Sequence, residues 1–187
     1  GDVREKAVTL GKIADILRAR GQLDEALRIR EQEQLPVFEK LGDVREKAVT
    51  LGKIADILQA RGQLDEALRI REQDELPVYE KLGDVREKAV TRGKIADILQ
   101  ARGQLDEALR IREQEELPVY EKLGDVRSLL VGRANLAALL YAKDAVVNAE
   151  RIMELLFSAL NDARRLNIPE AGRIEAILRQ MGWDGEG

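Results

Sequence analysis

A near-verbatim internal repeat constrains this chain more than any other feature of its sequence. The motif GDVR begins at Gly1, Gly42, Gly83 and Gly124, so each copy starts 41 residues after the one before. A period in this range is typical of solenoids, in which each unit buries its apolar side against the next unit. The first three copies are nearly identical, and the fourth diverges after Arg127. We therefore predict four units, 1–41, 42–82, 83–123 and 124–166, followed by a terminal segment, 167–187.

Each unit is predicted to form two helices joined by a tight turn. In the first unit, a helix from Asp2 to Arg20 carries apolar residues at steps of three and four, the spacing of an amphipathic helix. These apolar residues are Val3, Ala7, Leu10, Ile13, Ala14 and Leu17. Gly21 then supplies a left-handed stop. A second helix is expected to begin near Leu23 and to end at Gly42.

A proline recurs inside the second helix, at Pro36, Pro77 and Pro118. Two alternatives follow, because an interior proline costs about 3 kcal/mol: either the helix ends before it, or the helix continues with a kink. The apolar pattern continues past the proline, which favours the kink. The phase of this pattern slips at the polar run REQEQ, residues 30–34, and a one-residue bulge beside the proline would restore it.

The spacing of large, small and turn residues resembles that of the tetratricopeptide repeat (TPR). In the first unit the matching residues are Leu10, Ile13, Ala14, Leu17, Gly21, Leu23 and Ala26. In the fourth unit they are Leu136, Ala137, Leu140 and Ala149. The family unit is about 34 residues long, and the longer unit here, joined by LGD, is similar to a long-repeat bacterial subgroup. The resemblance covers 1–166 and implies an all-α, right-handed α-solenoid that acts as a protein-interaction scaffold.

The terminal segment is predicted to be a capping helix. Pro169 stands at a favoured helix start, and an apolar stripe follows at Ile174, Ile177, Leu178 and Met181. We expect this helix to cover the fourth unit, with Trp183 closing its end. The first unit has no comparable cover, so we expect an open N-terminal face and an array that was longer in the parent protein, with self-association through that face as the alternative role.

Composition argues against several classes of function. The net charge is −4 and the sequence pI is about 5.2, whereas a nucleic-acid platform needs a basic surface. No run of about 18 apolar residues exists, so no membrane span is predicted. The chain has no histidine, no cysteine and no glycine-rich phosphate loop, so we predict no catalysis, cofactor or metal site. The absence of cysteine also fits a cytoplasmic protein.

In the family that the chain resembles, the first helix of each unit lines a groove for a partner. Carried over by position, the groove residues are Lys12, Asp15, Arg18, Lys53, Asp56, Gln59, Lys94, Asp97, Gln100, Asn135 and Tyr141, with Ala138 beside the last two. One interpretation is a solvated face whose charges neutralise one another. The other is a polar groove that binds an extended peptide or a partner helix.

Two further series recur at the repeat spacing. At one stacked position Leu10 and Leu51 are followed by Arg92 and Arg133. This indicates either a half-exposed site that tolerates an arginine stem or a basic edge for an acidic partner. The polar runs REQEQ and REQEE are interpreted as a solvated outer ridge, with lateral self-association as the alternative.

An aromatic side chain also recurs, at Phe38, Tyr79 and Tyr120. We expect these rings to pack in the core between units, rather than to form a base-stacking platform.

Taken together, these patterns predict a protein-interaction module that binds a protein or peptide and neither nucleic acid nor membrane. The most favoured setting is the C-terminal sensor or scaffold arm of a larger bacterial signalling or defence protein. The alternative is a structural element that stacks head to tail through its open N-terminal face, because heterologous contacts of this kind grow into filaments unless symmetry closes them.

Overall fold

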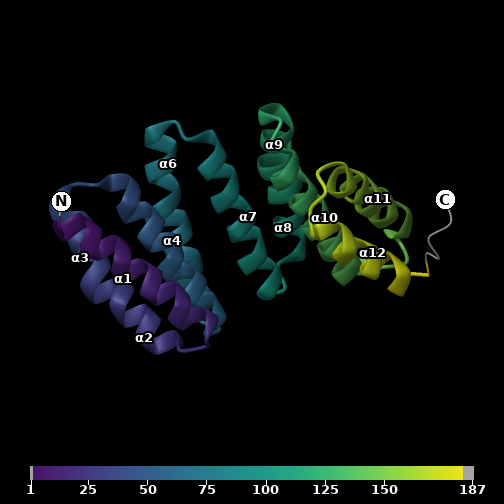
Figure 1. Cartoon of the computed structure of the whole chain (residues 1–187). Helices are drawn as coiled ribbons and strands as arrows, with labels where there is room; N and C mark the ends of the chain where they lie inside the picture. The colour runs from purple at the N-terminus through teal and green to yellow at the C-terminus, as the bar shows by residue number, and fades with distance from the viewer. Residues whose placement is uncertain (1, 183–187) are drawn as a thin grey trace. The chain divides into compact units, whose positions relative to one another are not determined.

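A computed structural model describes residues 2–182, which form helices joined by short turns (Figure 1). No strand occurs within that range, and none of its helices is both long enough and apolar enough to cross a bilayer. The first helices of the four predicted units are α1 (Asp2–Ala19), α4 (Val44–Ala60), α7 (Val85–Ala101) and α10 (Val126–Asp144).

The second helices of the first three units each contain a π-helical segment between two α-helical segments. They are α2 (Leu23–Arg28), η1 (Ile29–Gln34) and α3 (Leu35–Leu41); α5 (Leu64–Arg69), η2 (Ile70–Glu75) and α6 (Leu76–Leu82); and α8 (Leu105–Ile111), η3 (Arg112–Glu116) and α9 (Leu117–Leu123). The prediction of a continuous helix with a local bulge is therefore confirmed, and the alternative in which the helix ends before the proline is wrong.

The π-helical segment explains how a proline fits in this position. Pro36 lies in the first turn of α3, directly after η1, and Gln34 and Leu35 keep right-handed helical backbone angles. A proline lacks the amide hydrogen and crowds the carbonyl four residues earlier. A π turn bonds five residues back, so it widens the helix where the ring needs room.

A left-handed glycine followed by a capping aspartate joins each unit to the next. Gly42 has φ +66° and donates its amide hydrogen to the Glu39 carbonyl, while the Asp43 amide donates to Phe38. The Asp43 carboxylate then accepts the Glu46 amide at 3.1 Å and caps α4. The LGD sequence thus both ends one helix and starts the next.

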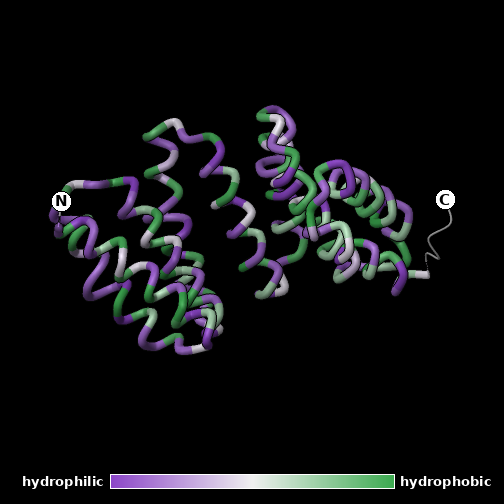
Figure 2. The backbone as a smooth tube through the Cα atoms, viewed as in Figure 1, coloured by the Kyte–Doolittle hydropathy of each residue, from purple (hydrophilic) through white to green (hydrophobic). Residues whose placement is uncertain are grey.

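The chain divides into two compact units, residues 1–102 and 103–187. This division falls inside the third predicted repeat, so the repeat boundaries stay predictions. In the first unit, small and β-branched side chains from successive hairpins share one core, and Figure 2 shows how apolar and polar residues alternate along each helix. Members of this core include Ala14, Ala26, Ile29, Ile54, Ala55, Ile57, Ala67 and Ile70.

In the second unit, α10 pairs with α11 (Ala149–Arg165), and α12 (Glu170–Gln180) packs against α11. Ile174 and Leu178 of α12 are buried, whereas Ile177 on the same predicted stripe is 42% exposed. The terminal helix is therefore confirmed as a helix, and its role as a cap stays a prediction. Trp183 lies outside the described residues.

The recurring aromatic side chains lie in the core, as predicted. Phe38, Tyr79 and Tyr120 are at most 4% exposed. Burial raises the pKa of Tyr79 to about 12, because the phenolate would lose its hydration.

The polar runs in the second helices form a solvated ridge only in their middle residues, so this prediction is wrong for the two ends of each run. Two of the polar side chains in each run are buried, namely Arg30 and Gln34, Arg71 and Glu75, and Arg112 and Glu116. In the first two repeats the π turn directs these side chains inward, so that they face the first helix of the same repeat. In the second repeat, Arg71 donates to Glu75 at 2.6 Å and to Asp56 of α4 at 2.6 Å.

A glycine in the first helix gives this buried pair its space. A Cβ atom at Gly52 would lie 2.6 Å from the Glu75 Oε1 atom and 2.9 Å from the Arg71 Nη1 atom. In the first repeat, Gly11 occupies the same position, and its carbonyl accepts a hydrogen bond from Arg30 at 2.9 Å. A mid-helix glycine costs about 1 kcal/mol relative to alanine, so its presence here follows from the close approach.

We expect Gly52→Ala to lower the free energy of unfolding by about 1–3 kcal/mol, measured by urea denaturation. The buried ends of Arg71 and Glu75 hold each other, so they cannot move aside cheaply. Gly172→Ala in α12 is the control, because a Cβ atom there meets nothing within 4 Å. That change should raise stability by up to about 1 kcal/mol. Equal stabilisation by both substitutions would contradict the close approach.

Candidate functional site

The groove residues predicted within residues 1–102 lie on the first helices of their repeats. Two of their aspartates already accept hydrogen bonds from arginines of the second helices. Asp15 of α1 accepts a hydrogen bond from Arg30 at 2.7 Å, and Asp56 of α4 accepts one from Arg71 at 2.6 Å. Both arginines are nearly fully buried and belong to the second helix of the same repeat. The aspartates therefore serve to neutralise a buried cation as well as to face the solvent.

The structure brings three of the predicted residues together around Asp56. Its carboxylate lies 3.9 Å from the Arg18 guanidinium of α1 and 3.8 Å from the Lys94 ammonium of α7. Because these contacts cross between neighbouring first helices, the three helices share this face. We call the surface formed by Lys12, Asp15, Arg18, Lys53, Asp56 and Lys94 the first-helix face.

Two lysines on the first-helix face are not neutralised in this way. Lys12 and Lys53 form no ion pair with any residue in the range 2–182. Lys12 is exposed and Lys53 is half-buried. Gln59, Asp97 and Gln100, also predicted for the groove, are half-buried on α4 and α7. The face thus combines paired aspartates with cations that remain available to a partner.

The buried arginines were missed as site residues in the sequence, although a signal for them exists. Arg71 and Glu75 are four residues apart, which places opposite charges on one side of a helix. The pair ends two residues before a proline, Pro77, and the first helix of the same repeat carries an unexplained glycine, Gly52. Those three features together could have indicated a buried ion pair.

Burial dominates the electrostatics of Glu75. Its side chain is 7% exposed, and loss of hydration raises the pKa of its carboxyl above the ordinary value. Arg71 opposes this rise through charge and hydrogen bonding, and the Thr91 hydroxyl of α7 donates a weaker bond at 3.3 Å. In the first repeat the equivalent residue is the neutral Gln34, which accepts from Arg30 at 2.6 Å.

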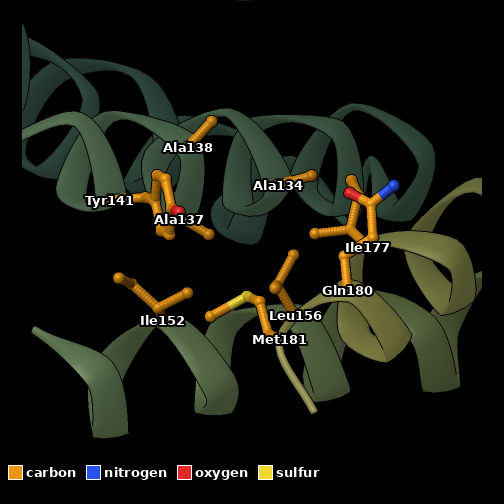
Figure 3. Close-up of a pocket in the computed structure, with 9 residues that line it drawn as sticks. All are labelled: Ala134, Ala137, Ala138, Tyr141, Ile152, Leu156, Ile177, Gln180 and Met181. Carbon is orange, nitrogen blue, oxygen red and sulfur yellow. The ribbon is translucent and has the colours of Figure 1, made fainter. Parts of the chain in front are cut away.

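In the second unit, an apolar cavity of about 320 Å³ lies between α10, α11 and α12 (Figure 3). Figure 3 shows Tyr141 and a row of alanines on one side, with Ile152 and Leu156 opposite and the end of α12 closing the third side. The lining residues are Ala134, Ala137, Ala138, Tyr141, Ile152, Leu156, Ile177, Gln180 and Met181. This lining offers hydrophobic contact to an inserted side chain.

Of the residues predicted for the groove in the fourth repeat, Tyr141 and Ala138 line this cavity and are exposed. Tyr141 is 58% exposed, which is unusual for a large aromatic side chain in a packed hairpin. Asn135 is half-buried on α10 and does not line the cavity.

The arginine series does not leave a free basic edge at its last member. Arg133 donates to the Ser158 hydroxyl at 2.9 Å and to the Asp162 carboxylate at 3.0 Å, both on α11. Its guanidinium also lies 3.6 Å from Glu121. These contacts favour the structural interpretation of the series, in which the arginine stem packs and its head is paired within the chain.

The pKa of Glu75 gives a testable dependence on pH. A carboxyl whose pKa is raised on folding stabilises the protein in its protonated form, below the unfolded pKa of about 4.3, and this contribution is lost as the pH rises. Glutamine stays neutral at every pH. We therefore expect the stability of Glu75→Gln, relative to the unmodified chain, to increase between about pH 4 and pH 7 in urea denaturation.

The exposed residue Glu72 provides the control, since Glu72→Gln removes the same charge from the same helix without changing the buried pair. The stability of this variant relative to the unmodified chain is the baseline with which the change for Glu75→Gln is compared. If Glu75→Gln instead became relatively less stable as the pH rises, the attraction of Arg71 would outweigh the cost of burial.

Comparison with known proteins identifies the fold. No protein-family model matches the sequence, and neither does any curated protein sequence. Among solved structures, a candidate kinesin light chain of Podosopora anserina with nearly identical TPR-like repeats matches with a TM-score of 0.69 and 21% identity, covering 87% of this chain and 77% of that one. A variant of the same protein, in which one glutamine is replaced by methionine, matches at 0.69 and 20%, covering 87% and 76%.

BtubC from P. vanneervenii matches with a TM-score of 0.70 and 16% identity, covering 99% of this chain and 85% of that one. Identities this low bear on the fold alone. The right-handed sense of the predicted superhelix and the 41-residue unit stay predictions. The chain has the all-α fold of a TPR-like helical-repeat solenoid.

Proposed function

We propose that this chain is a non-catalytic protein-interaction scaffold, and that it binds an acidic protein segment or peptide on the first-helix face. TPR-like folds generally serve to bind proteins or peptides, which supports the class of function. The observation that carries the proposal is the surplus of cations on this face, in a chain whose net charge is −4.

The surplus follows from how the charges pair. Asp15 faces Arg30, and Asp56 faces Arg71, Arg18 and Lys94, so both aspartates already have cationic partners. Lys12 and Lys53 then remain as unpaired positive charges on the same helices, among residues 2–182. A partner that brings carboxylates to these lysines gains attraction without displacing an existing ion pair. Such charge complementarity mainly sets specificity and the rate of association.

The cavity in the second unit supports a further element of recognition. Its alanine and isoleucine lining, with the exposed ring of Tyr141 beside it, suits a single apolar side chain. Aromatic and aliphatic anchors of this kind supply much of the binding energy in protein interfaces. Each feature is proposed for its own compact unit: acidic residues of a partner for the first-helix face, and one large apolar side chain for the cavity.

The proposed setting is a bacterial signalling or defence protein of the cytoplasm. The resemblance to long bacterial repeats and the absence of cysteine support this setting. Self-association through the open N-terminal face, the alternative predicted from the sequence, stays a prediction; Ile13 and Ile16 of α1, which are 42% and 55% exposed, are the residues through which it would act.

The first-helix face can be tested by reversing its free charges. We expect the chain to bind a fluorescein-labelled peptide of ten glutamates, measured by fluorescence anisotropy at low salt. Lys12→Glu with Lys53→Glu should weaken this binding at least about tenfold, since two cations become anions within about 10 Å of the bound peptide. Binding should also weaken as the ionic strength rises.

The matched control is Lys40→Glu with Lys81→Glu, because both lysines are exposed on the second helices and the change in net charge is identical. This control should keep the affinity of the unmodified chain. Equal loss in both variants would show that only net charge matters and would refute the site. A single-stranded oligonucleotide of the same charge serves as a second probe, and equal binding of it would argue for non-specific anion exchange.

A further inference from the structure

Two helices with almost the same sequence differ sharply in burial. Helices α1 and α4 match at every aligned position from Asp2 and Asp43 onward except Arg18, where α4 has Gln59. Yet Ile13 and Ile16 of α1 are 42% and 55% exposed, while the equivalent Ile54 and Ile57 are 2% and 1% exposed. Thr9 is likewise exposed, and its equivalent is 1% exposed.

This difference is confined to one side of the helix. Val3 is 60% exposed, and its equivalents Val44 and Val85 are both 53% exposed. General exposure of the first helix therefore does not explain the isoleucines. What differs is the preceding hairpin, because α2 and η1 pack against α4 and no described residue takes that place on α1.

The preceding hairpin also supplies charges to α4. Lys47 pairs with Glu39 at 2.9 Å, and Arg61 pairs with Asp24 at 3.3 Å. The N-terminal Asp43 of this helix accepts from Arg4 at 3.2 Å. The same three contacts recur one repeat later, between Lys88 and Glu80 at 2.9 Å, Arg102 and Asp65 at 3.3 Å, and Asp84 and Arg45 at 2.5 Å.

The equivalent charges on α1 have no such partners. Lys6, Arg20 and Asp2 form no ion pair with any residue between 2 and 182. They flank the exposed isoleucines in the same order as on α4. We call the surface formed by Asp2, Lys6, Ile13, Ile16 and Arg20 the α1 face.

We propose that the α1 face is a docking site for another helical hairpin of this chain's own repeat type. Within the first unit, the same set of residues binds such a hairpin twice, in front of α4 and in front of α7. The α1 face repeats that set with its apolar centre and its charged rim intact. An interface already formed twice by identical side chains thus defines what a third copy accepts.

The charges select a hairpin rather than a single helix. Glu39 and Asp24, which pair with α4, come from the second helix of the hairpin, whereas Arg4 comes from its first helix. An isolated amphipathic helix could cover the two isoleucines and satisfy Lys6 and Arg20. It would leave Asp2 without a cation. This inference does not depend on the partner proposed for the first-helix face.

The test fuses one further copy of residues 42–82 directly before Gly1, which recreates the junction between Leu82 and Gly83. We expect a higher thermal unfolding midpoint than in the unextended chain, because docking occurs only in the folded state. Amide hydrogens of α1 should also exchange at least about tenfold more slowly. If neither the unfolding midpoint nor the protection of α1 from exchange increases, the proposal is overturned.

Two substitutions make the test specific. Ile16→Asp should remove the increase in unfolding midpoint that the extended chain shows. It should have little effect on the unextended chain, where this side chain is already exposed to solvent. Val3→Asp is the control, since this valine is exposed in each of the first three repeats, and it should change both chains equally. An equal cost of Ile16→Asp in both chains would mean that the fused hairpin does not cover the α1 face.

A second copy of the whole chain is the competing occupant. Sedimentation of the unextended chain over a concentration series distinguishes it. A monomer at all concentrations is expected, because the docking hairpins in each copy already cover their own neighbours. Concentration-dependent dimers that Ile16→Asp abolishes would assign the α1 face to self-association and overturn the proposed occupant.

Discussion

A buried arginine in the second helix determines the local architecture of the first two hairpins. Arg71 is 4% exposed and lies between Glu75 on its own helix and Asp56 on the first helix. A buried cation is costly unless its hydrogen bonds are satisfied. Several otherwise odd features of the sequence follow from that need. The glycine leaves room for the guanidinium, and the aspartate accepts a hydrogen bond from it on the side of the first-helix face. The π turn directs the arginine and the glutamate toward the first helix.

The fourth hairpin supports this connection by lacking all of these features at once. At the positions 41 residues after Gly93, Arg112 and Glu116, the chain has Ala134, Met153 and Phe157. The second helix of this hairpin, α11, runs from Ala149 to Arg165 without a π segment. Apolar side chains replace the ion pair, so neither the glycine nor the bulge is required. We infer that the polar pair and the bulge are a single structural device.

The network also shapes the candidate binding face. Because Asp15 and Asp56 neutralise buried arginines, they contribute little free negative charge to the groove side. A sequence that looks balanced along each first helix therefore presents a positive surplus in three dimensions. The sign of a surface depends on which of its charges are already paired with buried residues. The spacing of residues along the sequence does not contain this information.

Much of the fold could be predicted from the sequence, because each local pattern, weak by itself, recurs in successive repeats. The helix pairs, the glycine stops, the capping aspartates and the buried rings at Phe38, Tyr79 and Tyr120 all follow from local rules. The phase slip before Pro36 even indicated the bulge. The polar run was misinterpreted because charged residues are usually exposed. Its burial depends on a partner helix, so local patterns could not reveal it. The cavity beside Tyr141 likewise depends on where α12 lies.

The junctions between units carry a consequence for how such a chain can vary. Each junction consists of a left-handed glycine and a capping aspartate, and the interfaces on either side are built from the same side chains. Among the first three repeats, few side chains identify the place of an interface in the order, which connectivity specifies. Loss or gain of one whole unit among them through unequal recombination therefore leaves the surviving interfaces nearly unchanged in chemistry. Such an array is free to change its length in single steps while the packing rules stay the same.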